Sequence, residues 1–382
     1  MNRKEIRVLV VDDSAVLREQ ISDIVNGADG LEVVGTARDG MEALACIPTL
    51  KPDVVTLDVH MPRMDGLTTL DAILAENPIP VIMVSALTQR AADVTLEALD
   101  RGAMDYVAKP ESLSIAGGAF STELIHKVRT MAGADVRRML QIRRTRAQRS
   151  SARTAQRSSA AQRSDASSSV QYENCCIAIG ISTGGPPALS ELFQSLEPPL
   201  PPIVVVQHMP ANFTGPFAAR LNTLSQLSIK EAETGDALRP NHALIAPGGR
   251  HLRLERRGKT VVARIIDGEP VSSHKPSVDV MMNDAAQIFG EHCLGVIMTG
   301  MGYDGSDGCG AIRAAGGYIL GQDEASSDVY GMNKVAFTAG HVDRQFSLGE
   351  LPQQLRQQCR RMFRLATPKA ATTVASGDPF TL

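Results

Sequence analysis

The feature that most constrains the fold is an alternation of short apolar runs with helical patterns along most of the chain. Near the start, runs such as IRVLVV and PVIMVS are each followed by a segment whose apolar residues recur every three or four positions. In the second half, CCIAIGI, PIVVVQ and CLGVIMTG are almost wholly apolar, which is typical of strands buried on both faces. This order predicts an α/β class with doubly wound parallel sheets.

A segment of different composition divides the chain in two. Residues 137–169 are rich in arginine and serine, repeat AQRSS, and contain almost no apolar residues. Such a segment cannot offset the entropy cost of ordering it, and its arginines either extend a tether or bind anionic partners. We therefore expect a domain at 1–125, a helix end and basic disordered linker at 126–169, a second domain at 170–365 and a flexible tail at 366–382.

The two predicted domains differ in their strand patterns. The first contains five strand–helix units, which predicts a five-stranded flavodoxin-like sheet with helices on both faces. The second is expected to be Rossmann-like. Its segments LRPNHALIAPG, HLRLER and KTVVARII are predicted to form a more antiparallel insertion bounded by Gly and Pro.

Composition excludes several classes of protein. The 382-residue chain is 43% hydrophobic and 21% charged, as globular proteins are, and its 4% aromatic content without Trp disfavours a base-stacking nucleic-acid surface. Six cysteines without C-x-x-C spacing indicate reduced thiols. There is no signal peptide pattern and no apolar span of about 20 residues, so we expect a cytoplasmic protein without membrane insertion.

Polar side chains follow four strands of the first domain. Asp12 and Asp13 follow the first strand, Asp58 the third, Ser85 the fourth and Lys109 the fifth. Carboxyl ends of parallel strands meet at one edge, so these groups should converge there. Three carboxylates suit Mg²⁺, which could hold a phosphoryl donor beside one of them. Taken singly, each residue could instead be a helix cap, a turn residue or a solvated lysine.

A candidate nucleophile opens the second domain. Gly180-Ile181-Ser182-Thr183-Gly184 is G-x-S-x-G between a buried strand and a helix, the context of a nucleophile elbow. The alternative is a glycine-rich loop that cradles phosphate, with Ser182 as a passive donor. Neither G-x-G-x-x-G nor G-x-x-x-x-G-K-[ST] is present, which disfavours the two best-defined nucleotide loops.

A serine nucleophile requires a base and an orienting acid. His208 ends the next strand and should reach the same edge as Ser182, whereas the other candidates fit less well: His242, His251, His274 and His292. Asp304 lies on a glycine-rich loop after a further buried strand, and Asp307 competes with it; either could merely cap the following helix. The order Ser, His, Asp differs from that of ordinary α/β-hydrolases.

The first domain resembles two-component receiver domains in LVVDDS, VVTLDVHMPRMDGL, VSALT and DYVAKP. The resemblance implies that Asp58 is the phosphoacceptor and binds Mg²⁺ with Asp12 and Asp13. It also implies a switch formed by Ser85, Tyr106 and Lys109. Position 60 is His, where relatives more usually have Asn or Glu. Because this side chain borders the phosphoryl group, we expect it to affect the lifetime of the phosphorylated state.

The second domain resembles the chemotaxis receptor glutamate methylesterases in IGISTGGP, VVVQHMP, HKPSVDVMM and IMTGMGYDGSDG. The resemblance implies a Ser182–His208–Asp304 triad, with backbone N–H groups of Thr183 and Met301 stabilising the oxyanion. It implies hydrolysis of glutamate γ-methyl esters on chemoreceptors, with glutamine deamidation in some relatives, and no cofactor for that hydrolysis. A chemotaxis histidine kinase would phosphorylate the receiver, which would otherwise block the active site.

Two other functional classes fit parts of the sequence. One is a non-enzymatic response regulator whose second domain binds a target, although no helix-turn-helix pattern supports DNA. The other is a general acyl hydrolase that acquired a receiver. Methanol release from methylated receptor, compared with hydrolysis of a simple ester, discriminates among these hypotheses.

Overall fold

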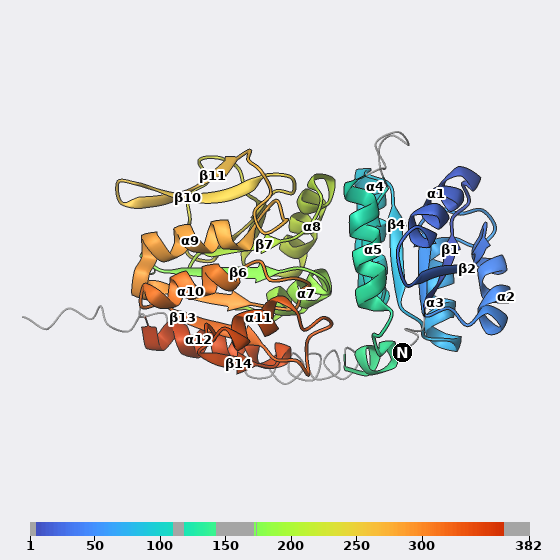
Figure 1. Ribbon diagram of the computed structural model, residues 1–382. Coiled ribbons are helices and arrows are strands. Elements are labelled where there is room, and N and C mark those ends of the chain that lie inside the picture. The colour runs from blue at the N-terminus through green and yellow to red at the C-terminus, as the bar shows by residue number, and fades with distance from the viewer. Residues whose placement is uncertain (1–4, 110–117, 143–171, 173, 363–382) are drawn as a thin grey trace, which may run out of the picture.

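The structure is a computed structural model that describes residues 5–109, 118–142, 172 and 174–362. Two α/β units follow one another along the chain and lie side by side, each built on a parallel sheet (Figure 1). Most of the predicted linker and all of the predicted tail lie outside the described residues. The α/β class and both parallel sheets are confirmed.

The first sheet has the strand order β2-β1-β3-β4-β5, and every pairing in it is parallel. Its strands are β1 (Ile6–Val11), β2 (Leu31–Ala37), β3 (Val54–Asp58), β4 (Val81–Ser85) and β5 (Asp105–Ala108). The helices are α1 (Ala15–Asn26), α2 (Gly40–Leu50), α3 (Gly66–Glu76), α4 (Gln89–Arg101) and α5 (Ala119–Met131), with one more at 136–142. All five predicted strands are present.

Local sequence explains where these helices begin. Ser14, Asp39, Asp65 and Thr88 each accept a backbone hydrogen bond at the start of α1, α2, α3 and α4, as capping residues do. Apolar residues of α1 and α5 pack on one face of the sheet, and those of α2, α3 and α4 on the other. Two covered faces explain why the strands are apolar on nearly every position.

The second unit is built on seven parallel strands in the order β14-β13-β12-β6-β7-β9-β8. These are β6 (Cys176–Ile181), β7 (Ile203–Gln207), β8 (Ser228–Glu231), β9 (His242–Ile245), β12 (Cys293–Ile297), β13 (Tyr318–Gln322) and β14 (Arg344–Phe346). An antiparallel pair, β10 (His251–Arg257) and β11 (Thr260–Ile266), forms a separate sheet.

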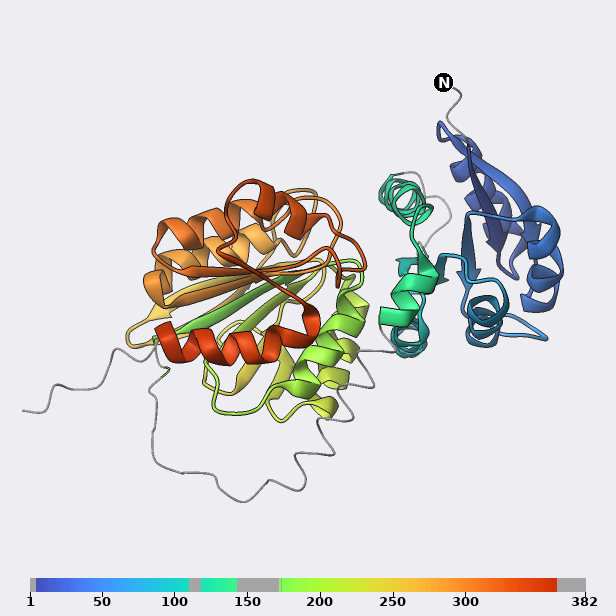
Figure 2. The same cartoon turned by 90° about the horizontal axis from the view of Figure 1, so that it is seen from below.

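Helices cover both faces of the second sheet (Figure 2). One face packs against α7 (Gly185–Ser195), α8 (Ala211–Leu224) and α12 (Leu351–Met362). The other packs against α9 (Val278–Phe289), α10 (Ser306–Ala314) and α11 (Met332–Thr338), with short 3₁₀ turns η1 (Gly290–His292) and η2 (Leu348–Glu350). The doubly wound arrangement is therefore confirmed in both units.

The expected antiparallel insertion is smaller than predicted. HALI forms β9, which pairs in parallel with both β7 and β8 inside the main sheet. Among the strands of the described residues, HLRLERR and TVVARII are the pair that runs antiparallel, and Ala237 adds a single antiparallel bridge to Val262. A four-residue apolar run is too short for its periodicity to reveal the direction of its partners, which is set by the tertiary topology.

The two units share one apolar cluster, which includes Leu99 of α4, Tyr106 of β5 and Phe213 of α8. Helix α4 packs against α7 and α8 across the contact. All six cysteines are free and none forms a disulfide. None of the helices in the described ranges is long and apolar enough to cross a membrane.

Candidate functional site

Ser182 lies on the turn that joins β6 to α7, as the strand–turn–helix pattern predicted. Its backbone N–H donates to the carbonyl of Thr299 at 3.0 Å, and its side chain is largely buried. Gly184 adopts a φ of 77°, and a Cβ there would lie 2.7 Å from Asp328. Glycine is thus required at this turn by both the backbone conformation and the lack of space.

His208 and Asp304 meet beside this turn. Strands β6 and β7 end at Ile181 and Gln207, which pair with each other. Ser182 and His208 are the next residues, so they follow the ends of neighbouring strands. His208 Nε2 lies 2.8 Å from Asp304 Oδ2. His208 Nδ1 is buried and makes no hydrogen bond with any described residue, and none joins the ring to Ser182 Oγ.

The structure separates Asp304 from its competitor Asp307, which lies in the first turn of α10. Asp304 Oδ1 accepts from Ser277 Oγ and the Asp279 N–H, and Oδ2 accepts from the Val278 N–H as well as from His208. Burial raises the pKa of this carboxyl, but hydrogen bonds from His208 and two backbone N–H groups outweigh it and lower the pKa to about 2. Asp304 is therefore an ionised, fully bonded partner of the His208 ring.

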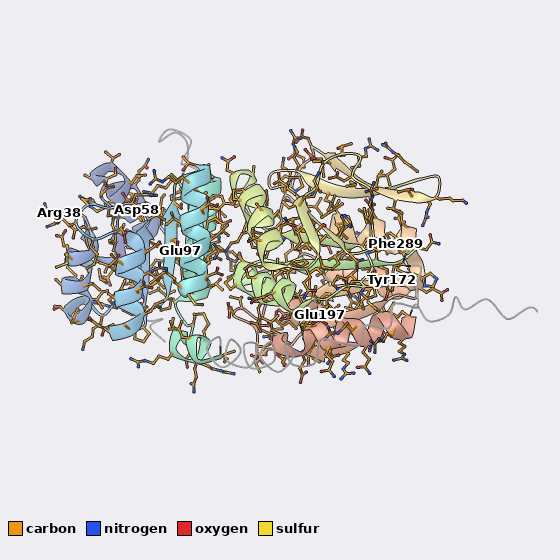
Figure 3. The ribbon with its side chains drawn as sticks, turned by 180° about the vertical axis from the view of Figure 1, so that it is seen from behind. Arg38, Asp58, Glu97, Tyr172, Glu197 and Phe289 are labelled. Atoms are coloured by element: carbon orange, nitrogen blue, oxygen red, sulfur yellow. The ribbon has the colours of Figure 1, made fainter. Side chains whose placement is uncertain are left out.

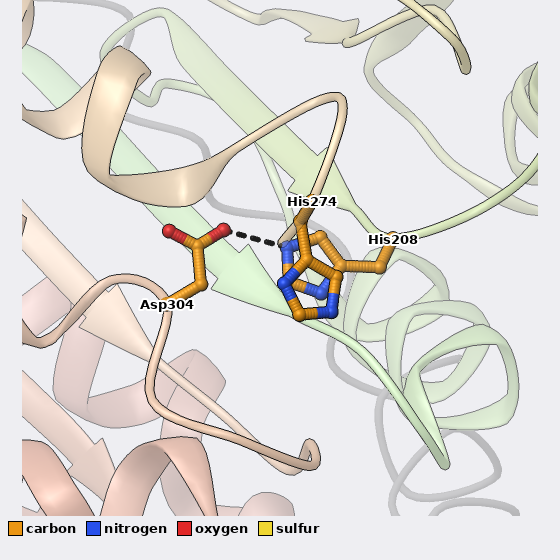
Figure 4. Close-up of side chains that lie close together, drawn as sticks. All are labelled: His208, His274 and Asp304. Carbon is orange, nitrogen blue, oxygen red and sulfur yellow. Dashed lines mark hydrogen bonds and ion pairs between the residues drawn. The ribbon is translucent and has the colours of Figure 1, made fainter. Parts of the chain in front are cut away.

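His274 also belongs to this site, although its loop position made it a weak candidate in sequence. Its ring stacks on that of His208 with centroids 3.8 Å apart and planes 11° from parallel (Figure 4). Its Nδ1 lies 2.7 Å from the Ser272 carbonyl. Burial, reinforced by His208, lowers the pKa of His274 to about 4, so this ring is neutral at neutral pH. Tertiary structure brings it here, and the sequence signal for it is that the HKPSVDVMM segment, which carries the family resemblance, begins at His274.

Potential ligand atoms of His208, His274 and Asp304 lie within 4.8 Å of one another. A tetrahedral metal site would need their lone pairs to converge on one point. The two rings are nearly parallel, so lone pairs in their planes do not converge, and His208 Nε2 is already directed at Asp304. The arrangement suits proton transfer better than metal binding.

The two predicted oxyanion donors flank Ser182. Thr183 follows it directly, and Met301 follows Gly300, where a Cβ would lie 2.8 Å from that of Ser182. Neither the Thr183 nor the Met301 N–H donates to another described residue. Thr299 Oγ1 donates to the Thr183 carbonyl at 3.0 Å, which ties the two loops together.

The acidic residues of the first unit converge as predicted. Asp12 and Asp58 are buried while Asp13 is exposed, and their carboxylate oxygens lie within 4.8 Å of one another. Lys109 Nζ lies 2.8 Å from both Asp12 Oδ2 and Asp58 Oδ1. Burial raises the pKa of Asp58 despite the opposing ammonium. The three carboxylates form a donor set of the kind that holds Mg²⁺.

Of the three predicted switch residues, Lys109 lies in the pocket, while Ser85 and Tyr106 make contacts outside it. Ser85 Oγ accepts from Thr95 Oγ1 at 2.7 Å. Tyr106 is buried and stacks on Phe213 of the second unit, with ring centroids 4.8 Å apart. Figure 3 places Asp58 within the first unit and Glu97 on α4, the helix that borders the second unit. Tyr106 thus contacts the neighbouring unit directly.

The first unit contacts the turn that carries Ser182. Thr183 Oγ1 donates to Asp105 Oδ2 at 2.6 Å, and Thr130 Oγ1 lies 2.7 Å from the sulfur of Met301. Further out, Arg220 pairs with Asp100, and Asn212 Nδ2 donates to the Leu87 carbonyl. In this structure the first unit therefore lies over part of the candidate site.

Comparisons with known proteins agree with this geometry. Residues 8–115 match the response regulator receiver domain family, and residues 177–355 match the CheB methylesterase family. A protein-glutamate methylesterase/protein-glutamine glutaminase of Geobacter metallireducens is 43% identical over 376 residues, covering 96% of this chain and 100% of its own. A protein of the same name from Pectobacterium atrosepticum is 44% identical and covers 93% and 97%.

The chain belongs to the CheB methylesterase family. A crystal structure of the catalytic domain of Thermotoga maritima CheB methylesterase is 36% identical, covers 48% of this chain and 98% of its own, and gives a TM-score of 0.47. Family membership confirms the resemblance predicted from both sets of motifs. The similarity to the Geobacter metallireducens protein covers that protein's whole length and 96% of this chain, so it includes both matched ranges.

Proposed function

We propose that this protein is a phosphorylation-activated hydrolase that removes methyl groups from glutamate γ-methyl esters of chemoreceptors. The products are glutamate and methanol, and the same carbonyl chemistry deamidates receptor glutamines with ammonia leaving. The observation that carries this proposal is the His208–Asp304 pair, 2.8 Å apart, one strand away from the elbow residue Ser182. The names of the relatives support the same reaction.

The proposed mechanism gives each nitrogen of the base a different role, which its hydrogen bonds support. Because Nε2 of His208 is directed at Asp304, its Nδ1 is the atom that takes the Ser182 proton. Ser182 then attacks the ester carbonyl, and N–H groups of Thr183 and Met301 stabilise the oxyanion. The protonated base returns its proton to the leaving methanol, and water repeats the sequence on the acyl-enzyme.

We propose that Asp58 of the receiver accepts the phosphoryl group from a chemotaxis histidine kinase. Asp12, Asp13 and Asp58 would hold Mg²⁺, whose positive charge would offset the negative charge of the phosphoryl group. Lys109, now 2.8 Å from Asp58, would pair with the acyl phosphate. Ser85 and Tyr106 would respond to it as the switch.

Phosphorylation would act by loosening the contact between the two units. Tyr106 stacks on Phe213, and its neighbour Asp105 accepts from Thr183, so the proposed switch strand adjoins the proposed oxyanion loop. A phosphoryl group that draws Tyr106 inward would disfavour the docked state. We place the functional domains at 1–125 and 170–365, which contain the ranges matched by the two families.

The decisive experiment measures methanol release from methylated receptor fragments, with and without acetyl phosphate. We expect release from the receptor substrate, faster with acetyl phosphate, and little hydrolysis of a simple ester. Equal turnover of both substrates would favour a general acyl hydrolase, and absence of turnover would favour a non-enzymatic response regulator.

A further inference from the structure

Gln207, the residue before the proposed base, links the ends of β6 and β7 through its side-chain amide. Gln207 is 2% exposed. Its Nε2 donates at 3.0 Å to the carbonyl of Ser182 and at 3.0 Å to that of His208. One carboxamide therefore holds the backbone of both the proposed nucleophile and the proposed base.

Gly185 is shaped to admit this carboxamide. A Cβ at Gly185 would lie 1.9 Å from Gln207 Oε1 and 2.9 Å from its Cδ, distances that no real contact allows. The residue is the first of α7 and does not have a positive φ, so its backbone conformation would accept alanine. Glycine is therefore needed here for space and not for conformation.

The peptide plane links this amide to catalysis. The Ser182 carbonyl and the Thr183 N–H belong to one planar trans peptide, so fixing the oxygen fixes the opposite direction of the N–H. That oxygen also accepts from the Gly185 N–H at 2.8 Å. Two donors thus set the direction of an N–H that, in the proposed function, meets the oxyanion.

We infer that Gln207 is a positioning residue for ester hydrolysis, and that Gly185 is glycine so that the Gln207 carboxamide can reach the elbow. Gln207 does not touch substrate: it acts by orienting the Thr183 N–H and by fixing the distance between Ser182 and His208. This inference rests on the proposed function. Because the oxyanion forms only in the transition state, the orientation of the Thr183 N–H affects kcat and not KM.

The first test replaces the amide by a side chain of similar length that lacks donors. We expect Gln207→Met to lower kcat for receptor methyl esters roughly 100-fold, the scale of a small misplacement at a reacting centre, with KM unchanged. Gln358→Met in α12 is the control, because Gln358 is also a buried amide and no hydrogen bond joins it to the elbow within the described residues. It should leave kcat as in the wild-type chain.

The second test is a double-mutant cycle in the full-length protein. Gly185→Ala should lower kcat although alanine favours the helix, because its Cβ displaces the carboxamide. In a Gln207→Ala background the carboxamide is gone and Ile181 Cγ1, 3.0 Å away, is the neighbour left to adjust to that Cβ, so the same change should cost little further kcat. Equal costs in both backgrounds, or full kcat in Gln207→Met, would overturn the inference.

Failure of the proposed function has a different signature. If the wild-type chain releases no methanol, or Ser182→Ala releases it at the wild-type rate, the proposed function fails whatever Gln207 does. If wild-type turnover depends on Ser182 while Gln207→Met lowers kcat only in proportion to the folded fraction, the positioning role alone is wrong.

Discussion

The acidic pocket of the receiver and the site around Ser182 occupy the same place in two similar sheets but manage charge in opposite ways. In the pocket, buried Asp12 and Asp58 share one ammonium, that of Lys109. Around Ser182, Asp304 is the carboxylate that faces the base, and it receives four hydrogen bonds. The receiver pocket therefore holds more carboxylates than ammonium groups. At the Ser182 site, hydrogen bonds stabilise the negative charge of Asp304.

The comparison shows that the sheet topology places both sites at the carboxyl ends of the strands, and that the side chains there determine the chemistry of each site. Excess carboxylate attracts a cation and, with it, a phosphoryl group. A fully bonded carboxylate beside a histidine orients the ring for proton transfer. Each of the following predictions tests one side of that comparison.

Removing the proposed nucleophile, Ser182, should have the largest effect. Ser182→Ala is expected to lower kcat for receptor methyl esters by about 10⁴-fold or more, since losing a triad serine removes the covalent route. His208→Ala should be comparable, and Asp304→Asn less severe. Methanol release measures the rate, and circular dichroism checks that the fold is kept. Substantial turnover by folded Ser182→Ala would exclude the serine mechanism.

Removing the proposed phosphoacceptor, Asp58, should abolish activation and leave basal hydrolysis unchanged. Asp58→Asn is expected to take up no acid-labile phosphate from acetyl phosphate and to keep its basal turnover. Labelling that persists would place the acceptor elsewhere. As the companion variant, His60→Asn should change the dephosphorylation rate without changing Mg²⁺ affinity, because the His60 side chain is exposed and is not one of the three proposed carboxylate ligands.

Breaking the contact between units should raise basal activity. Arg220→Glu places two like charges where Arg220 now pairs with Asp100, and neither residue belongs to a proposed site. We expect basal turnover to rise toward that of a chain shortened to begin near Val170, roughly 5–150-fold for a coupling of 1–3 kcal/mol. The reversed pair Asp100→Arg with Arg220→Glu should restore inhibition. If the shortened chain is no faster than the intact chain, inhibition by docking is wrong.

Replacing the stacked histidine should have a moderate effect. His274→Ala removes a neutral ring that packs on His208, and we expect kcat to fall about 10-fold as the base becomes less well oriented. His274→Phe keeps a flat neutral ring and should retain most of the activity. Similar losses in both variants would mean that a hydrogen bond of His274, and not its stacking, is what matters.

The smallest effect concerns a buried acid next to Asp304. Burial, with the charge of Asp304 adding to it, raises the pKa of Asp279 to about 6. A raised carboxyl pKa favours folding below the unfolded value near 3.8, and this stabilisation is lost as pH rises to about 6. Asp279→Asn should therefore raise the melting temperature by a few degrees at pH 7 and hardly at pH 4. An equal shift at both pH values would contradict this assignment.

The sequence by itself determined the parallel α/β class, the strand ends and the side chains that follow them. Apolar runs marked β6 and β7, and the residues just beyond, Ser182 and His208, proved to be neighbours across the sheet. Local patterns suffice for this because a parallel sheet brings successive strand ends to one edge. The receiver pocket followed from the same rule, since Asp12, Asp58 and Lys109 converge there.

Only the tertiary structure decided what depends on contacts between distant segments. It placed β9 inside the parallel sheet, chose Asp304 over Asp307 through N–H groups at the start of α9, and stacked His274 on His208. It also joined Thr183 to Asp105, 78 residues away. Periodicity reports which face of an element is buried but not what lies against it, so packing of one segment on another had to supply these features.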